Sequence, residues 1–179
     1  MRKIIAVIAL CCAPAFSAAP TGIGKFLDED LTNLEREIVP LVEEMPAGQY
    51  QFAPSDGEFI GVRTFGVQVR HVAAVTFLVS SAILAEKNPS DPGARENGPD
   101  SLKNKEEIVK YLKDAFAYAH KAMASLTDSN LADMVKSPFG SGEMPRIKMA
   151  TLITAHGFDH YGQLVVYLRM KGIVPPASR

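Results

Sequence analysis

The sequence predicts an all-α fold, a four-helix bundle with long interhelical loops. Four segments of about 20 to 27 residues repeat apolar side chains every three or four positions, which is the period of an amphipathic helix. No segment alternates apolar and polar residues convincingly as a strand does, and stretches rich in Pro and Gly separate the four helices. Helices that each bury one face pack most economically as a bundle. The long connections leave the order of the helices open.

The first two predicted helices differ in how much of their surface is apolar. Residues 24–45 carry Leu, Ile and Met on one face, and Pro40 is expected to kink or break this helix. Residues 62–86 are apolar on nearly every side, so we expect this helix at the centre of the bundle. The segment between them is rich in Pro, Gly and aromatic residues, which predicts a loop that covers a site or only links two helices.

Capping residues mark the other two helices. Asn104 and Glu107 have the spacing of a capping box, so the third helix is expected to start there and to run to about Leu126. The fourth begins near residues 143–145 and ends before Gly172, a left-handed terminator followed by two prolines.

The first 19 residues have the features of a secretory signal peptide. Two basic residues precede a short apolar run, and small residues follow it, with cleavage expected after Ser17 or Ala19. The apolar run is too short to span a bilayer. The mature domain is then 20–179, and its expected location is periplasmic or extracellular. A lipoprotein anchored at Cys11 or Cys12 is the alternative, but the residues before these cysteines fit that signal poorly.

Composition excludes several classes of chemistry. Both cysteines lie in the predicted signal, so the mature chain has no disulfide, thiolate nucleophile or cysteine ligand. Removal of the signal takes two basic residues from 19 and leaves 17 Lys and Arg against 20 Asp and Glu, a formal charge of −3. No basic stripe predicts a nucleic-acid partner, and no membrane association is expected after signal cleavage.

The stretch "LITAHGFDHYGQ" contains two histidines, His156 and His160, at a spacing of four. Helical rotation places both on the stripe that carries Met149, Ile153 and Leu164, so they should point into the core. Burying two unpaired imidazoles costs on the order of 1 to 3 kcal/mol each, whereas one divalent cation would satisfy both. The pair therefore favours a metal site.

A third ligand must come from upstream, because no Asp, Glu, His or Cys follows His160. His71 faces the core from the apolar second helix, whereas His120 flanks the stripe of the third helix and is interpreted as a boundary or surface residue. The predicted metal ligands are His71, His156 and His160. Imidazoles suit zinc, nickel, iron, copper or manganese, and an incomplete protein shell favours chemistry or ligand capture over a structural role.

Other patterns compete with this hypothesis. A di-iron bundle needs Glu three residues before each histidine, and a His-Glu-x-x-His peptidase needs an acid where Gly157 stands. A reversed peptidase pattern is nearer, since Asp159 precedes His160, but its downstream acidic ligand is absent. Asp159 and Gln163 could orient a histidine ring, and Tyr50 and Glu58 could reach the site from their loop. Core histidines that are only hydrogen-bonded remain the metal-free alternative.

Three stretches, "VRTFGVQVRHVAAV", "HGFDHYGQ" and "LVVYLRMKGIVPP", resemble the DinB-like (DinB/YfiT) superfamily of four-helix bundles. The resemblance implies a divalent cation held by His71, His156 and His160. Some relatives are thiol-dependent transferases or isomerases. Many relatives have arginine after the second histidine of the pair, where this chain has Tyr161.

Together these observations predict an exported DinB-like protein that binds a divalent metal ion (zinc, nickel, iron or manganese) and acts on a small-molecule substrate. Its expected activity is that of a metal-dependent hydrolase or a thiol transferase. A homodimer is left open. The alternative is a metal-free helical binding or scaffold protein whose core histidines are hydrogen-bonded.

Overall fold

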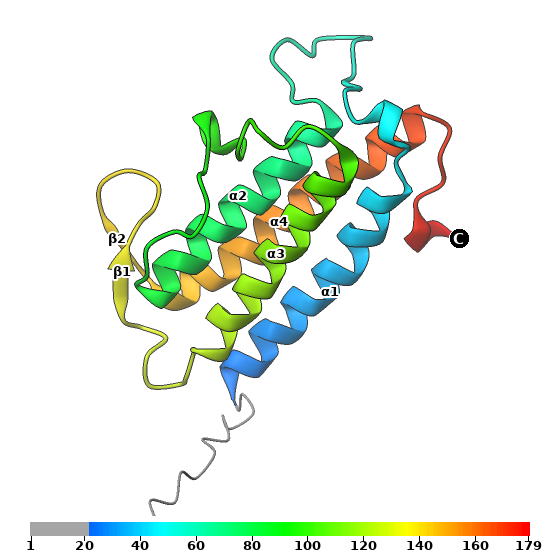
Figure 1. The fold of residues 1–179 in the computed structure, drawn as a ribbon. Coiled ribbons are helices and arrows are strands. Elements are labelled where there is room, and N and C mark those ends of the chain that lie inside the picture. Colours follow the sequence, from blue (N-terminus) through cyan, green and yellow to red (C-terminus); the bar gives the residue numbers. More distant parts are fainter. Residues whose placement is uncertain (1–21) are drawn as a thin grey trace, which may run out of the picture.

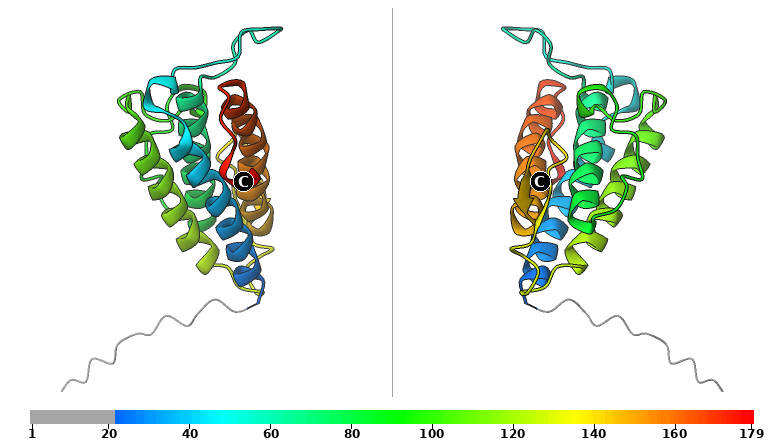
Figure 2. Two further views of the ribbon diagram at one scale, coloured as in Figure 1. Left: turned by 90° about the vertical axis from the view of Figure 1, so that its right-hand side faces the viewer. Right: turned by 90° about the vertical axis from the view of Figure 1, so that its left-hand side faces the viewer.

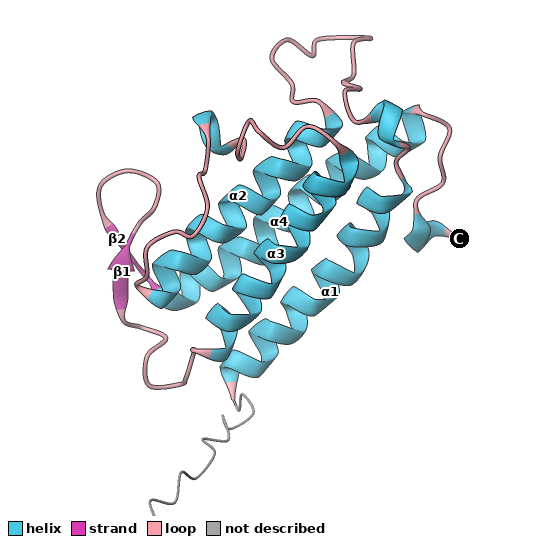
Figure 3. Ribbon diagram, viewed as in Figure 1, coloured by secondary structure: helices cyan, strands magenta, loops and turns pink. Residues whose placement is uncertain are grey.

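A computed structural model describes residues 22–179 and confirms the all-α prediction (Figures 1 and 3). Four long helices make a bundle, and the connections between them are long, as expected. The helices are α1 (Ile23–Glu44), α2 (Phe65–Leu84), α3 (Lys105–Ala124) and α4 (Arg146–Met170). The predicted signal peptide, residues 1–19, lies outside the described residues. The domain boundary and the export of the protein therefore stay predictions.

The order of the helices is up, down, down, up. The side chain of Lys105, at the start of α3, donates to the carbonyl of Met45 just after α1 (2.9 Å), so α1 and α3 are antiparallel. Lys121, near the end of α3, pairs with Glu86 just after α2 (2.8 Å), so α2 and α3 are parallel. The connection 85–104 must therefore run back along the whole bundle, and Figure 1 shows it doing so.

Helix α2 is the central helix, as its composition predicts. It packs against α3 and α4, and α1 lies diagonally opposite and packs against the same two helices. By length and composition α2 could also cross a membrane, but 78% of its most apolar stretch is buried by the rest of the protein, which is usual for the core helix of a globular bundle. Its burial on all sides explains its apolar sequence.

The helix ends follow the sequence signals closely. Asn104 and Glu107 form the predicted capping box, with the Asn104 side chain accepting from the Glu107 amide at 2.8 Å. Gly172 adopts the predicted left-handed conformation, with φ of 72°. Pro40 lies within continuous helix α1 instead of breaking it. The helix therefore tolerates the loss of the one backbone hydrogen bond that proline cannot donate.

The expectation that no strand occurs is wrong for one short hairpin. Strands β1 (Met134–Lys136) and β2 (Glu143–Pro145) pair antiparallel between α3 and α4. Three residues are too few to show a recognisable alternation of apolar and polar positions, and the glycines at 140 and 142 suit the turn between them. The hairpin lies at one end of the bundle, and the loop 51–64 projects from the other (Figures 1 and 2).

Candidate metal centre

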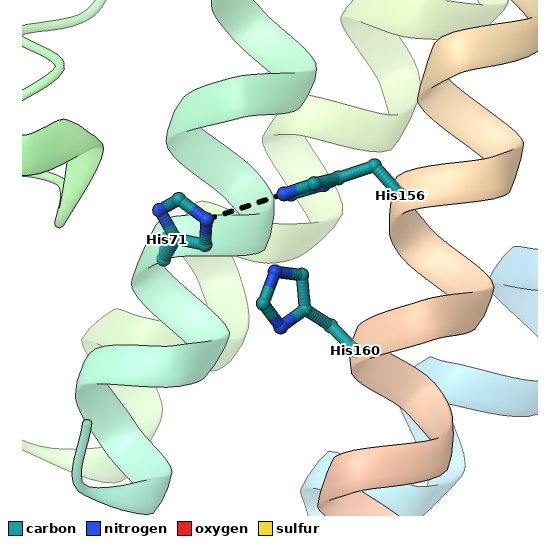
Figure 4. Close-up of side chains that lie close together, drawn as sticks. All are labelled: His71, His156 and His160. Atoms are coloured by element: carbon teal, nitrogen blue, oxygen red, sulfur yellow. Dashed lines mark hydrogen bonds between the residues drawn. The ribbon is translucent and has the colours of Figure 1, made fainter. Parts of the chain in front are cut away.

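The three predicted ligands converge between α2 and α4 (Figure 4). His71 reaches across from α2, and His156 and His160 reach back from successive turns of α4. One ring nitrogen of each histidine lies within 4.8 Å of the other two. The ring centroids are separated by 5.0 Å (71 to 156), 4.9 Å (71 to 160) and 4.4 Å (156 to 160). Among the described residues, no other group of three or more His, Cys, Asp or Glu side chains brings one ligand atom of each within such a distance of all the others.

Close packing of α4 fixes the position of the histidine pair. Gly157, between the two histidines, faces Leu34 of α1, and any side chain at this position would collide with the Leu34 side chain. Glycine therefore lets α4 approach α1 while His156 and His160 turn toward α2. The same residue explains why the helix lacks the acid that a His-Glu-x-x-His peptidase requires.

A backbone carbonyl holds the third histidine. The Nδ1 of His71 donates to the carbonyl oxygen of Glu96 (2.8 Å), which lies in the long connection 85–104. This bond assigns the proton of neutral His71 to Nδ1 and leaves the lone pair of Nε2 directed at the cluster. Arg95 and Glu96 both adopt left-handed backbone conformations, with φ of 57° and 52°. These conformations are costly for residues other than glycine, so the tertiary structure imposes this turn.

The spacing of the nitrogens suits a shared cation. Nε2 of His71 and Nε2 of His156 are 3.2 Å apart. Two nitrogens at 2.0 to 2.1 Å from one zinc ion are about 3.4 Å apart at the tetrahedral angle and about 2.9 Å apart at a right angle. The observed separation lies between these values. It also suits a hydrogen bond between the two rings, as the metal-free alternative requires.

His160 is not fully hydrogen-bonded within residues 22–179. Its Nδ1 is buried and has no hydrogen-bond partner among the described residues. The side chain of His160 is otherwise well packed, with 7% of the residue exposed. A core of hydrogen-bonded histidines would leave no ring nitrogen without a partner, because such a group costs stability. A cation held through Nε2 would leave the same Nδ1 without a partner, so this nitrogen does not choose between coordination and a purely structural role.

Burial keeps the three imidazoles neutral. Burial is the main cause that lowers the pKa of His156 to about 3 and that of His160 to about 4, and the neighbouring histidines add to both shifts. Burial also lowers the pKa of His71. The charge of Arg63 contributes to the lowering in all three. Neutral imidazoles have the lone pairs that a metal requires, so the cluster is ready to coordinate at neutral pH.

The remaining candidates from the sequence lie elsewhere. His120 is half-buried at the α1–α3 boundary, as predicted, and is not part of the cluster. Gln163 accepts from Gln68 (2.8 Å) and donates to Asp159 (3.0 Å), so neither Asp159 nor Gln163 orients a histidine ring. The buried Tyr50 hydroxyl donates to the Val42 carbonyl, and Glu58 is exposed on the projecting loop.

Sequence reasoning missed the parts of the site that come from irregular segments. Arg63 precedes the N-cap residue of α2 and donates through Nε to the side chain of Asn97 (2.7 Å). Glu96 contributes through its carbonyl, which carries no sequence signal. An arginine beside a helix start is too common to indicate a site, so only the path of the connection 85–104 reveals these contacts.

Comparison with known proteins agrees with this architecture. The family model for the DinB superfamily matches residues 30–164, most of the bundle and all three histidines. The chain belongs to the DinB superfamily. No curated protein matches it.

Two solved structures have a similar fold. One is a DinB-like protein from Bacillus cereus, 16% identical, with a TM-score of 0.68 over 85% of this chain and 95% of that one. The other is a conserved protein from Enterococcus faecalis, 14% identical, with a TM-score of 0.66 over 84% of this chain and 97% of that one. At these identities the similarity establishes the fold of this DinB-superfamily protein and leaves its chemistry to be argued from its own residues.

Proposed function

We propose that this protein binds one divalent metal ion through His71, His156 and His160 and uses it as a reaction centre for a small-molecule substrate. The observation that carries the proposal is the convergence of three neutral imidazoles, two buried and one half-buried, with one nitrogen of each within 4.8 Å of the other two. Zinc, nickel, iron and manganese all accept imidazole ligands. Three protein ligands leave coordination positions for water or substrate, which is the pattern of catalytic rather than structural zinc sites.

Each protein residue has a defined task in such a centre. A bound cation supplies Lewis acidity, which polarises a substrate carbonyl or increases the acidity of a bound water or thiol. The Glu96 carbonyl fixes the tautomer and the ring plane of His71. Burial of His156 and His160 keeps protons from competing for their lone pairs. The half-buried position of His156 gives a small molecule access to the cluster.

The two candidate reactions are those that the sequence suggests, hydrolysis and thiol transfer. Both use an open position on the cation, so the ligand set alone does not choose between them. For export, the support is the N-terminal sequence of residues 1–19. The chain has no cysteine after residue 12, so a thiol nucleophile must come from the substrate side.

Elemental analysis of protein purified without an affinity tag tests the proposal. After growth with zinc, nickel, iron and manganese all supplied, we expect close to one equivalent of one of these metals per chain. Chelator treatment should remove the metal and lower the melting temperature, because a ligand that binds only the folded state stabilises it by mass action. Metal content near zero, with an unchanged melting temperature in chelator, would instead support the metal-free scaffold.

A further inference from the structure

Arg63 lies beside the histidine cluster and has a hydrogen-bonding group that the fold does not use. Its Nε donates to Asn97 (2.7 Å) and its Nη2 to the carbonyl of Arg95 (3.2 Å). The next carbonyl, that of Glu96, accepts from His71. One turn of the connection 85–104 therefore holds Arg63 and His71 through consecutive carbonyls. Within residues 22–179, Nη1 of Arg63 donates no hydrogen bond.

The charge of Arg63 is only partly balanced by the protein. No carboxylate of the described residues lies within 4.0 Å of its guanidinium, and Glu96 is the acidic side chain whose charge acts on it from farther away. The guanidinium is half-buried, so water screens it less than it screens a surface arginine. Beside a bound divalent cation, this arrangement attracts an anion. A guanidinium also matches the planar geometry of a carboxylate.

An apolar hollow lies between residues that neighbour Arg63 and the end of α4. It has a volume of about 190 Å³ and is lined mainly by Phe59 and Val62 of the projecting loop and by Val166, Tyr167 and Met170 of α4. Val62 precedes Arg63 in the chain, and the Tyr167 hydroxyl donates to the Arg63 carbonyl (3.0 Å).

The hollow is also lined by residues on the same face of α4 as the histidines. Gln163 lines it and follows His160 by three residues, and Tyr167 follows by seven, so both continue the histidine stripe toward the end of α4. A larger hollow of about 460 Å³ lies between β1, β2 and the end of α2, and no histidine lines it. Of these two hollows, only the smaller is lined by α4 residues that continue the stripe of His160.

We propose that Arg63 binds the oxyanion of the ligand that reaches the metal centre and that the hollow receives the ligand's apolar part. The ligand class is a small organic acid with a short apolar body. The small volume of the hollow suits a short chain or one ring. This inference rests on the proposed function, because the third contact of the ligand is with the bound metal.

Cobalt-loaded protein and two matched series of thiols test the role of Arg63. The probes are thioglycolate, 3-mercaptopropionate and 4-mercaptobutyrate, each compared with the mercapto-alcohol of the same length. The sulfur-to-cobalt charge-transfer band reports binding and gives a dissociation constant without any turnover. At one chain length, we expect the acid to bind about tenfold more tightly than the alcohol, which is the size of a charge-assisted hydrogen bond.

Variants distinguish binding of the acid by Arg63 from chelation of the cobalt by the acid alone. Chelation of cobalt by the acid alone would survive Arg63→Gln, whereas the proposal expects this variant to lose about tenfold of the acid's advantage and to leave the alcohol's affinity unchanged. Arg63→Lys should keep part of the advantage. Lys103→Gln makes the same change of charge at an exposed side chain of the same connection, and the charge of Lys103 is not among those that act on Arg63, so this variant should keep the whole advantage.

The outcomes distinguish this inference from the proposed function. Cobalt uptake with equal affinities for acids and alcohols at every length would overturn the inference and leave the metal centre intact, and so would an unchanged advantage in Arg63→Gln. If the wild-type protein takes up no cobalt, the proposed function fails and the inference fails with it.

The apolar part of the proposal has its own measurement. 2-Mercapto-3-phenylpropionate should bind more tightly than 2-mercaptopropionate, and Phe59→Ser should reduce that difference several-fold by removing apolar surface from the hollow. Ile60→Ser changes the neighbouring residue, which is 97% exposed and does not line the hollow, and should have no effect. Equal effects of the two variants would exclude the hollow as the binding region.

Discussion

The bundle contains two histidine sites with opposite surroundings. In the cluster, three imidazoles face one another in a buried space between α2 and α4. At the α1–α3 boundary, His120 has a carboxylate at each ring nitrogen, Asp28 at 2.6 Å and Glu35 at 3.1 Å. Burial would lower the pKa of His120, but its hydrogen bonds to the two carboxylates raise the pKa overall. The surroundings thus favour the neutral ring in one site and the protonated ring in the other.

The difference shows that the number of histidines in a bundle says little about metal binding. What matters is whether the neighbours of a ring favour its proton or leave its lone pair available. Protonated His120 donates through both nitrogens to the two carboxylates of α1, and a ring in that state has no lone pair to offer. The cluster consists of three histidines and contains no carboxylate.

Removal of one cluster histidine should give the largest difference between the two sites. We expect His160→Ala to lower zinc affinity by more than about 100-fold, because loss of a direct ligand should exceed the 10- to 100-fold loss typical of residues that only orient ligands. His71→Ala should behave similarly, and His120→Ala should bind zinc like the wild type. Isothermal titration calorimetry measures all three. A loss of affinity in His120→Ala equal to that in His160→Ala would contradict the assignment of the ligands.

The histidines should also titrate at opposite ends of the pH range in the metal-free protein. Imidazole resonances of His156 and His160 should inflect near their lowered pKa values of about 3 and 4, whereas His120 should inflect above the ordinary value of 6.5. ¹H–¹³C NMR of labelled histidine measures these midpoints. His120→Gln identifies the highest midpoint by removing it. A lowest midpoint that belongs to His120 would refute the comparison.

The lowered and raised pKa values predict how the stability of the metal-free protein depends on pH. Below pH 6.5 the unfolded chain protonates residues 156 and 160 while the folded protein does not, so the cluster lowers the stability of the metal-free protein progressively as the pH falls toward 4. His120 has the opposite effect and stabilises the folded protein at low pH. Its contribution is complete below its unfolded pKa of about 6.5 and is lost as the pH rises through its raised folded value.

Local patterns in the sequence account for the helices and for the cluster of three histidines, but not for the residues that support them. The spacing of His156 and His160 and the apolar surroundings of His71 predict convergence, because helical periodicity fixes which side chains share a face. The carbonyl of Glu96 could not be predicted, since its position depends on the return path of the connection 85–104. Arg63 and the short hairpin were missed for the same reason, as contacts of irregular segments depend on tertiary structure.

A smaller effect is expected from disturbing the turn that orients His71, a support that His120 does not share. Gly98 has φ of 72°, and a Cβ there would lie 3.1 Å from the Arg70 Cβ and 3.2 Å from the Tyr111 ring. Gly98→Ala should therefore displace the turn and weaken zinc binding about tenfold. Gly140→Ala is the matched control, because Gly140 has φ of 86° with nothing within 4 Å. Both should lose about 1 kcal/mol of stability through backbone strain, but only Gly98→Ala should change zinc affinity.

The smallest effect is expected from removing one carboxylate beside His120. Asp28→Asn keeps the size of the side chain and removes a charge-assisted bond from a group that is about one-third exposed, with 32% of the side chain accessible. The expected loss in the free energy of unfolding is about 0.5 to 1 kcal/mol at pH 6, measured by urea denaturation of the metal-free protein. The loss should shrink above the raised pKa of His120, because the neutral ring no longer attracts the carboxylate. Asp30→Asn changes an exposed acid on the same helix and should have little effect at either pH. A loss in Asp28→Asn that is the same at pH 6 and above the raised pKa would mean that His120 is neutral in the folded protein at both pH values, and the contrast between the two histidine sites would then disappear.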